Sequence, residues 1–135
     1  MHSASGPRPA LPSVLVIEDD PVIAEAIAEI VGEAGYKPVS VSALAPARAA
    51  LASERPGVVI LDLTLQSEFG ADLLEELAGA ADAPPVVIVS AFGLAKMVGQ
   101  RYSVPVVMKP FGIDQLLSAV EKAFSTNTRP SRVGT

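Results

Sequence analysis

Residues 14–21 read Val-Leu-Val-Ile-Glu-Asp-Asp-Pro, a short apolar run that ends in three acidic residues and a proline. A run of aliphatic and β-branched residues bounded by turn-forming residues predicts a buried strand. Two further runs end in a similar way, because Asp62 follows residues 58–61 and Lys109 follows residues 104–108. If these strands are parallel in one sheet, their carboxyl ends share an edge, and the acidic residues and the lysine meet there.

Strand-like and helix-like segments alternate along the chain. We expect strands at 14–17, 39–41, 58–61, 86–89 and 104–108, each followed by a helical pattern, and Pro21 and Gly35 suit the start and the end of the first helix. Five βα units predict a parallel sheet that is covered by helices on both faces. We therefore predict an α/β, flavodoxin-like, doubly wound fold with strand order 2-1-3-4-5, whose expected site lies beyond strands one and three.

Composition restricts the class of protein. Half of the 135 residues are apolar, which allows one domain with a substantial core, and there is no cysteine for a disulfide or a thiolate zinc site. All 15 acidic residues but only seven of the ten basic ones lie in residues 13–124, which argues against direct nucleic-acid binding. No apolar run approaches the roughly 20 residues that span a bilayer. We expect a cytoplasmic protein with a flexible leader at 1–12, a domain at 13–125 and a flexible tail at 126–135.

The acidic residues at the predicted sheet edge call for a cation. Carboxylates a few ångströms apart repel one another, and an all-oxygen site suits Mg²⁺ or Mn²⁺. A nearby ammonium group suits an incoming phosphoryl group. Asp20 is better explained as the cap of the helix that starts at Pro21 than as part of this site.

Four motifs carry a family resemblance. Residues 14–21 are followed by Val-Val-Ile-Leu-Asp-Leu-Thr-Leu at 58–65, Val-Ile-Val-Ser-Ala at 87–91 and Met-Lys-Pro-Phe at 108–111. Each motif alone is weak, but the four in this order, each at the end of a predicted strand, are highly specific. Over roughly residues 13–124 the chain resembles a response-regulator receiver domain of two-component signalling, of the chemotaxis-regulator-like, single-domain type.

The resemblance implies a role for each acidic residue. Asp62 is the expected phosphoacceptor, whose carboxylate oxygen attacks a phosphoryl group and becomes an acyl phosphate. Asp19, Asp62 and the backbone carbonyl of Thr64 are expected to bind Mg²⁺ directly, and Glu18 through a metal-bound water. The plainer alternative for Asp62 is an ordinary strand-ending residue that caps a loop.

The resemblance also assigns Lys109 and Ser90. Lys109 is expected to pair with Asp62 before phosphorylation and with a phosphoryl oxygen afterwards, and the Lys109–Pro110 bond is expected to be cis. Ser90 matches the hydroxyl that hydrogen-bonds the phosphoryl group and acts as the switch. The alternatives are a solvated loop lysine and a hydroxyl that caps a loop or helix.

Three departures from the family pattern concern output. Val106 stands where the family usually has tyrosine or phenylalanine, so the usual aromatic switch cannot operate there. Ser90 and Lys109 are closer in sequence than is common, which predicts a short or irregular fourth helix near 94–101. Gln66 replaces a common proline and predicts a looser loop after Asp62.

The resemblance implies a phosphoacceptor rather than an enzyme. The phosphoryl group is expected from a histidine kinase or a histidine phosphotransfer protein. About ten polar residues follow residue 124, which leads us to expect output through contact with a downstream protein or through onward phosphorelay. We expect no direct contact with nucleic acid or with a membrane. A weak homodimer is left open. The alternatives are a module from a hybrid kinase or transcription factor, a phosphorylation-independent interaction domain, or a flavodoxin-like cofactor binder. The acidic residues after the first strand disfavour the last.

Overall fold

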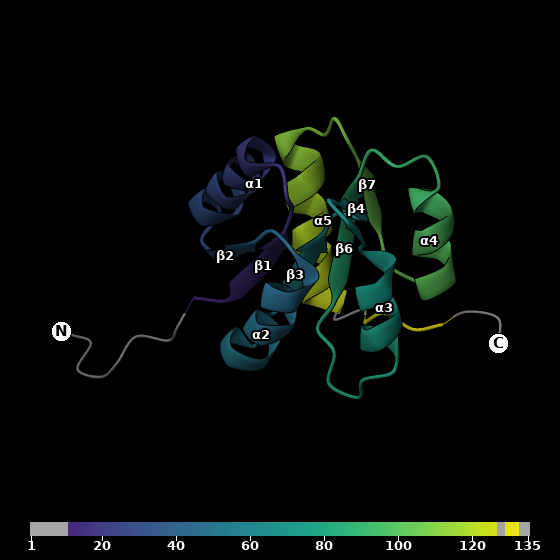
Figure 1. The fold of residues 1–135 in the computed structure, drawn as a ribbon. Coiled ribbons are helices and arrows are strands. Elements are labelled where there is room, and N and C mark those ends of the chain that lie inside the picture. The colour runs from purple at the N-terminus through teal and green to yellow at the C-terminus, as the bar shows by residue number, and fades with distance from the viewer. Residues whose placement is uncertain (1–10, 127–128, 133–135) are drawn as a thin grey trace.

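We describe residues 11–126 and 129–132 of the protein in a computed structural model (Figure 1). Most of the expected leader at 1–12 and part of the expected tail at 126–135 lie outside these residues. The elements of the five-stranded sheet and its helices are β1 (Ser13–Ile17), α1 (Pro21–Glu33), β2 (Lys37–Val41), α2 (Leu44–Glu54), β3 (Val58–Leu61), α3 (Ala71–Ala78), β6 (Val86–Ser90), α4 (Ala95–Tyr102), β7 (Val106–Met108) and α5 (Ile113–Thr126).

The main sheet is parallel throughout, with the order β2-β1-β3-β6-β7. Because β6 and β7 are the fourth and fifth strands of this sheet along the chain, the predicted order 2-1-3-4-5 is confirmed. Strands β1 and β3 are neighbours in the centre, with Ile17 opposite Leu61. Their carboxyl ends therefore lie side by side.

Alternating side chains of the strands build two cores, one on each face of the sheet. Leu15 and Ile17 of β1 pack on the face that α2, α3 and α4 cover, whereas Val14 and Val16 pack on the face that α1 and α5 cover. Figure 1 shows these helices in layers on either side of the sheet. Burial of both faces explains why the inner strands β1, β3 and β6 are nearly continuous apolar runs rather than alternating patterns.

The N-terminal ends of α1 and α2 are capped in different ways, α1 by a neighbouring residue and α2 by a distant one. Asp20 caps α1, because its Oδ1 accepts hydrogen bonds from the backbone N–H groups of Val22 (2.9 Å) and Ile23 (3.3 Å). The N-cap residue of α2 is Ala43, whose side chain makes no capping hydrogen bond. The N–H of Leu44 instead donates to Oε2 of Glu68 at 2.9 Å, so a residue 24 positions later supplies the cap.

The loop after Asp62 forms a small antiparallel hairpin, β4 (Thr64–Leu65) and β5 (Glu68–Phe69), which was not predicted. Its turn is Gln66-Ser67, and Ser67 has a φ of 69°. Gly70 follows at a point where a Cβ would lie 2.4 Å from the carbonyl oxygen of Asp62. The loop that was expected to be looser is thus hydrogen-bonded and closely packed.

The last strand is shorter than predicted. It begins at Val106 rather than at residue 104, because the N–H of Val104 donates to the carbonyl of Gly99 at 2.9 Å and so closes the end of α4. Helix α4 has only eight residues, which confirms the expected short fourth helix. None of the helices in the described part of the chain is long and apolar enough to cross a membrane.

Candidate functional site: an acidic pocket with one lysine

The site lies at the carboxyl edge of the main sheet. The N–H of Asp62 donates to the carbonyl of Ile17 at 3.0 Å, which aligns the end of β3 with the end of β1. The N–H of Lys109 donates to the carbonyl of Ser90 at 2.9 Å, which aligns the end of β7 with the end of β6. Backbone pairing therefore fixes at one edge the residues that follow four different strands. In open α/β sheets this edge, where neighbouring connections diverge, is the usual place for a binding site.

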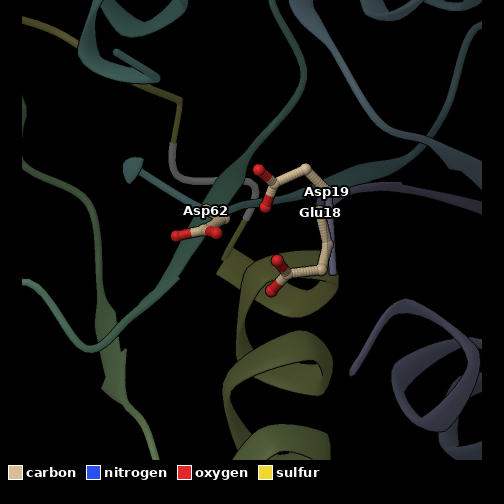
Figure 2. A group of neighbouring side chains, drawn as sticks. All are labelled: Glu18, Asp19 and Asp62. Carbon is tan, nitrogen blue, oxygen red and sulfur yellow. The ribbon is translucent and has the colours of Figure 1, made fainter. Parts of the chain in front are cut away.

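Three carboxylates converge in this pocket. Glu18, Asp19 and Asp62 each offer an oxygen atom, and these atoms lie within 4.8 Å of one another. Figure 2 shows Glu18 and Asp19, from adjacent positions after β1, turned toward Asp62. Glu18 and Asp62 are each only 3% exposed, whereas Asp19 is half-buried. So much negative charge in so little solvent requires a compensating cation.

Lys109 supplies part of that compensation. Its Nζ lies 2.5 Å from Oε1 of Glu18 and 3.5 Å from Oδ2 of Asp62, and its side chain is 16% exposed. The Lys109–Pro110 peptide bond is cis, as the resemblance implied. The expected pairing with Asp62 is present, but the shorter contact is with Glu18.

Burial and neighbouring charges in this pocket raise the pKa values of Glu18 and Lys109. Burial raises the pKa of Glu18, and the hydrogen bond from Lys109 offsets that rise only in part. For Lys109, burial acts to lower the pKa, but the hydrogen bond to Glu18 and the charge of Asp62 outweigh it, so the pKa is raised. The lysine is therefore held as an ammonium ion next to the carboxylates.

The hairpin after β3 holds two of the carboxylates in place. Oδ1 of Asp62 accepts hydrogen bonds from the N–H of Thr64 (3.1 Å) and from its hydroxyl (3.4 Å). Oδ2 of Asp19 accepts a hydrogen bond from the N–H of Gln66 at 2.6 Å. Thr64 thus lies beside Asp62, where the sequence predicted it, whereas sequence reasoning missed the contact of Gln66 because its partner is 47 residues away.

Ser90 ends β6 at the same edge of the sheet and is fully buried. Its hydroxyl oxygen accepts a hydrogen bond from the N–H of Phe92 at 3.0 Å. Phe92 in turn packs edge-to-face against Phe69 of the hairpin, with ring centroids 5.7 Å apart. The hydroxyl therefore holds the start of the loop that leads into α4, and this loop contacts the hairpin next to the acidic pocket.

The pocket fits a small hard cation. Its donors are carboxylate oxygens, which are the ligands that Mg²⁺ and Mn²⁺ prefer. An open cavity of about 520 Å³ lies beside Glu18 and Asp19, between the start of α1 and the end of β2. This cavity reaches Glu18 and Asp19, whereas Asp62 and Lys109 do not line it. All six predicted site residues, namely Glu18, Asp19, Asp62, Thr64, Ser90 and Lys109, lie at this edge of the sheet.

Known proteins resemble this chain in sequence and in fold. Residues 14–121 match the sequence profile described as "Response regulator receiver domain". The transcriptional regulatory protein KdpE of Mycobacterium tuberculosis is 36% identical over 117 residues, which are 85% of this chain and 52% of that protein. Protein Rrf1 of Nitratidesulfovibrio vulgaris is 32% identical over 116 residues, or 84% of this chain and 83% of that protein. The chain thus spans about half the length of the first relative and most of the second.

A solved structure gives the same result. The receiver (REC) domain of the PhyR response regulator from Erythrobacter litoralis superimposes with a TM-score of 0.77 at 28% identity, over 92% of this chain and 98% of that domain. This chain belongs to the response regulator receiver family of two-component signalling.

Proposed function

We propose that Asp62 accepts a phosphoryl group from a phosphohistidine donor, either a histidine kinase or a histidine phosphotransfer protein. The observation that carries this proposal is the convergence of Asp62 with Glu18, Asp19 and Lys109 in one pocket. A carboxylate oxygen of Asp62 forms the new P–O bond as the bond from phosphorus to the donor imidazole nitrogen breaks. The leaving imidazole nitrogen keeps the electron pair of that bond, and a proton already carried by the other ring nitrogen of the phosphohistidine makes the released histidine neutral. The protein acts here as a phosphoacceptor.

The other pocket residues hold and neutralise charge in this proposal. Asp19, Asp62 and the carbonyl of Thr64 would hold Mg²⁺, with Glu18 acting through a metal-bound water. The ion supplies positive charge next to the transferring group. Lys109, already an ammonium ion, is close enough to Asp62 to contact a phosphoryl oxygen there. The two cations together balance the added charge of the acyl phosphate.

Ser90 is the proposed switch. In the structure described here its oxygen accepts the N–H of Phe92. A phosphoryl group on Asp62 offers the Ser90 hydroxyl an anionic acceptor, and a move toward it removes the bond that holds Phe92. The loop into α4 is then free to rearrange, which shifts a two-state equilibrium and changes the surface that a partner meets. Output by contact with a downstream protein, or by onward phosphorelay, follows from this change. The absence of nucleic-acid contact remains a prediction from the acidic sequence, and the cytoplasmic location remains a prediction from the lack of a long apolar run.

The test is covalent labelling with acetyl phosphate and Mg²⁺, followed by intact-protein mass spectrometry. We expect the wild-type chain to gain one phosphoryl group and Asp62→Asn to gain none. Asp82→Asn, which removes an exposed carboxylate before β6, is the matched control and should label like the wild type. Equal labelling of Asp62→Asn and the wild type would refute the assignment of the acceptor.

A further inference from the structure

The segment Arg129-Pro-Ser-Arg132 returns to the body of the protein and contacts α4. The N–H of Ser131 donates to the carbonyl of Tyr102, the last residue of α4, at 2.9 Å. This carbonyl lies in the final turn of the helix, where no later helical N–H is available to it. Pro130 beside it is buried. The segment thus completes the C-terminal end of α4 rather than passing over it.

One carboxylate ties this segment and α4 to α3. Oε1 of Glu75 accepts a hydrogen bond from Nε of Arg132 at 2.8 Å and also pairs with its Nη2, while Oε2 accepts the hydroxyl of Tyr102 at 2.7 Å. Nη1 of Arg129 donates to the carbonyl of Ala81, just beyond α3, at 3.3 Å. The hydrogen bond from Arg132, followed by that from Tyr102, lowers the pKa of Glu75, so the carboxylate stays ionised at neutral pH.

Helix α4 lies between this contact and the switch. Its first residue, Ala95, comes three residues after Phe92, and the N–H of Ala95 donates to the carbonyl of Phe92 at 3.0 Å. At its middle the helix presses against β7, because a Cβ on Gly99 would lie 2.4 Å from Cγ2 of Val106. The short helix is thus held at its start by the switch loop, at its centre by β7 and at its end by the C-terminal segment.

We propose that the face between α3 and α4 is a docking site for the basic segment 129–132 of this chain, and that the docked segment restrains α4 against the rearrangement that phosphorylation of Asp62 induces. The second half of this statement rests on the proposed function. Two equilibria are linked here: docking of the segment, and the change of α4 from its resting to its activated position. If docking shifts the second equilibrium toward the resting position by some factor, activation must weaken docking by the same factor. Loss of the contact therefore favours the activated form.

The test compares two arginine variants of the full chain. Arg132→Ala removes the pairing of the segment with Glu75. Arg48→Ala is the matched control, because it removes a similarly exposed two-point pairing of an arginine with Glu76, also on α3, which joins α3 to α2 and not to α4. Arg129→Ala/Arg132→Ala removes both arginine contacts of the segment.

The first readout is hydrogen exchange of the α4 amides, measured by mass spectrometry without any phosphodonor. We expect exchange in α4 to be roughly two- to fivefold faster in Arg132→Ala, the factor set by one exposed ion pair, and faster still in the double variant. Arg48→Ala should leave α4 unchanged. Equal exchange of α4 in the wild type and the double variant would show that the segment does not restrain the helix.

The second readout is a titration with beryllofluoride and Mg²⁺, followed by the amide NMR signals of residues 90–92. We expect the midpoint to fall in Arg132→Ala by the same factor by which α4 exchange rises. A midpoint that stays at the wild-type value while α4 exchange rises would overturn the coupling and leave the proposed function intact. A wild-type chain that gives no response at any concentration would contradict the proposed function, and the coupling would fall with it.

Discussion

The Nζ of Lys109 lies 2.5 Å from Oε1 of Glu18, a residue 91 positions earlier in the chain, and 3.5 Å from Oδ2 of Asp62. The closer partner of the lysine is therefore Glu18, the residue that in the proposed function contacts the metal only through a water. If the pocket binds a metal as proposed, metal binding and lysine pairing draw on the same carboxylates, and the stability of the pocket then depends on both cations.

Lys109→Ala should destabilise the protein in metal-free buffer. The substitution leaves Glu18 and Asp62 buried without their ammonium partner, and we expect a loss of about 2 kcal/mol in the free energy of unfolding. Urea denaturation in the presence of a chelator measures it. Lys122→Ala, which removes an exposed lysine of α5, is the control and should change the unfolding free energy by less than about 0.5 kcal/mol. An equal, small effect of the two substitutions would show that the pocket does not depend on this charge.

Mg²⁺ should stabilise the wild-type chain by mass action. At a free concentration about ten times the dissociation constant, we expect the free energy of unfolding to rise by about 1.4 kcal/mol. Asp19→Asn should lose most of this gain because it removes a direct ligand, whereas Asp82→Asn should keep it. Titration of the melting temperature with MgCl₂ separates these cases. The same rise in Asp19→Asn as in the wild type would remove Asp19 from the metal site.

The pH dependence of stability should report Glu18. Burial raises its pKa above the ordinary value of 4.5, so the folded chain keeps this proton at a pH at which the unfolded chain has lost it. The contribution of Glu18 to stability is therefore greatest below the unfolded pKa and falls as the pH rises through the folded pKa. Without metal, Glu18→Gln should gain stability relative to the wild type between about pH 4.5 and neutrality. Parallel stability curves for the two proteins would contradict the raised pKa.

Gly70→Ala should disturb the acceptor directly. The added Cβ would lie 2.4 Å from the carbonyl oxygen of Asp62, and the backbone must move to make room. We expect a loss of about 1–3 kcal/mol in the free energy of unfolding together with slower labelling by acetyl phosphate. Gly112→Ala is the control, because nothing lies within 4 Å of its added Cβ. Wild-type labelling and stability in Gly70→Ala would show that this close approach does not fix the position of Asp62.

Most of the fold could be predicted from the sequence because its strands are buried on both faces. Such strands appear as uninterrupted apolar runs, and the residue after each run then marks the edge of the sheet. The pocket followed from this reasoning, since Asp19, Asp62 and Lys109 all come directly or nearly directly after such a run. Asp20 could be separated from the pocket because it precedes a proline at a helix start.

The parts that sequence reasoning missed depend on distant contacts. The hairpin at 64–69 has the turn Gln66-Ser67, which lacks the glycine or asparagine that usually marks such turns. The cap of α2 by Glu68 requires knowledge of how that hairpin lies against α2. The contacts of segment 129–132 likewise depend on Glu75 and Tyr102, to which no local pattern points.

The most direct measurement is the chemical location of the phosphoryl group. Reduction of the labelled chain with borohydride converts a phosphorylated aspartate into homoserine, and peptide sequencing by mass spectrometry identifies the modified position. The account predicts homoserine at position 62 and nowhere else, with none formed in Asp62→Asn or in unlabelled protein. Homoserine at position 19 or at another acidic residue, with an unmodified Asp62, would contradict the central claim.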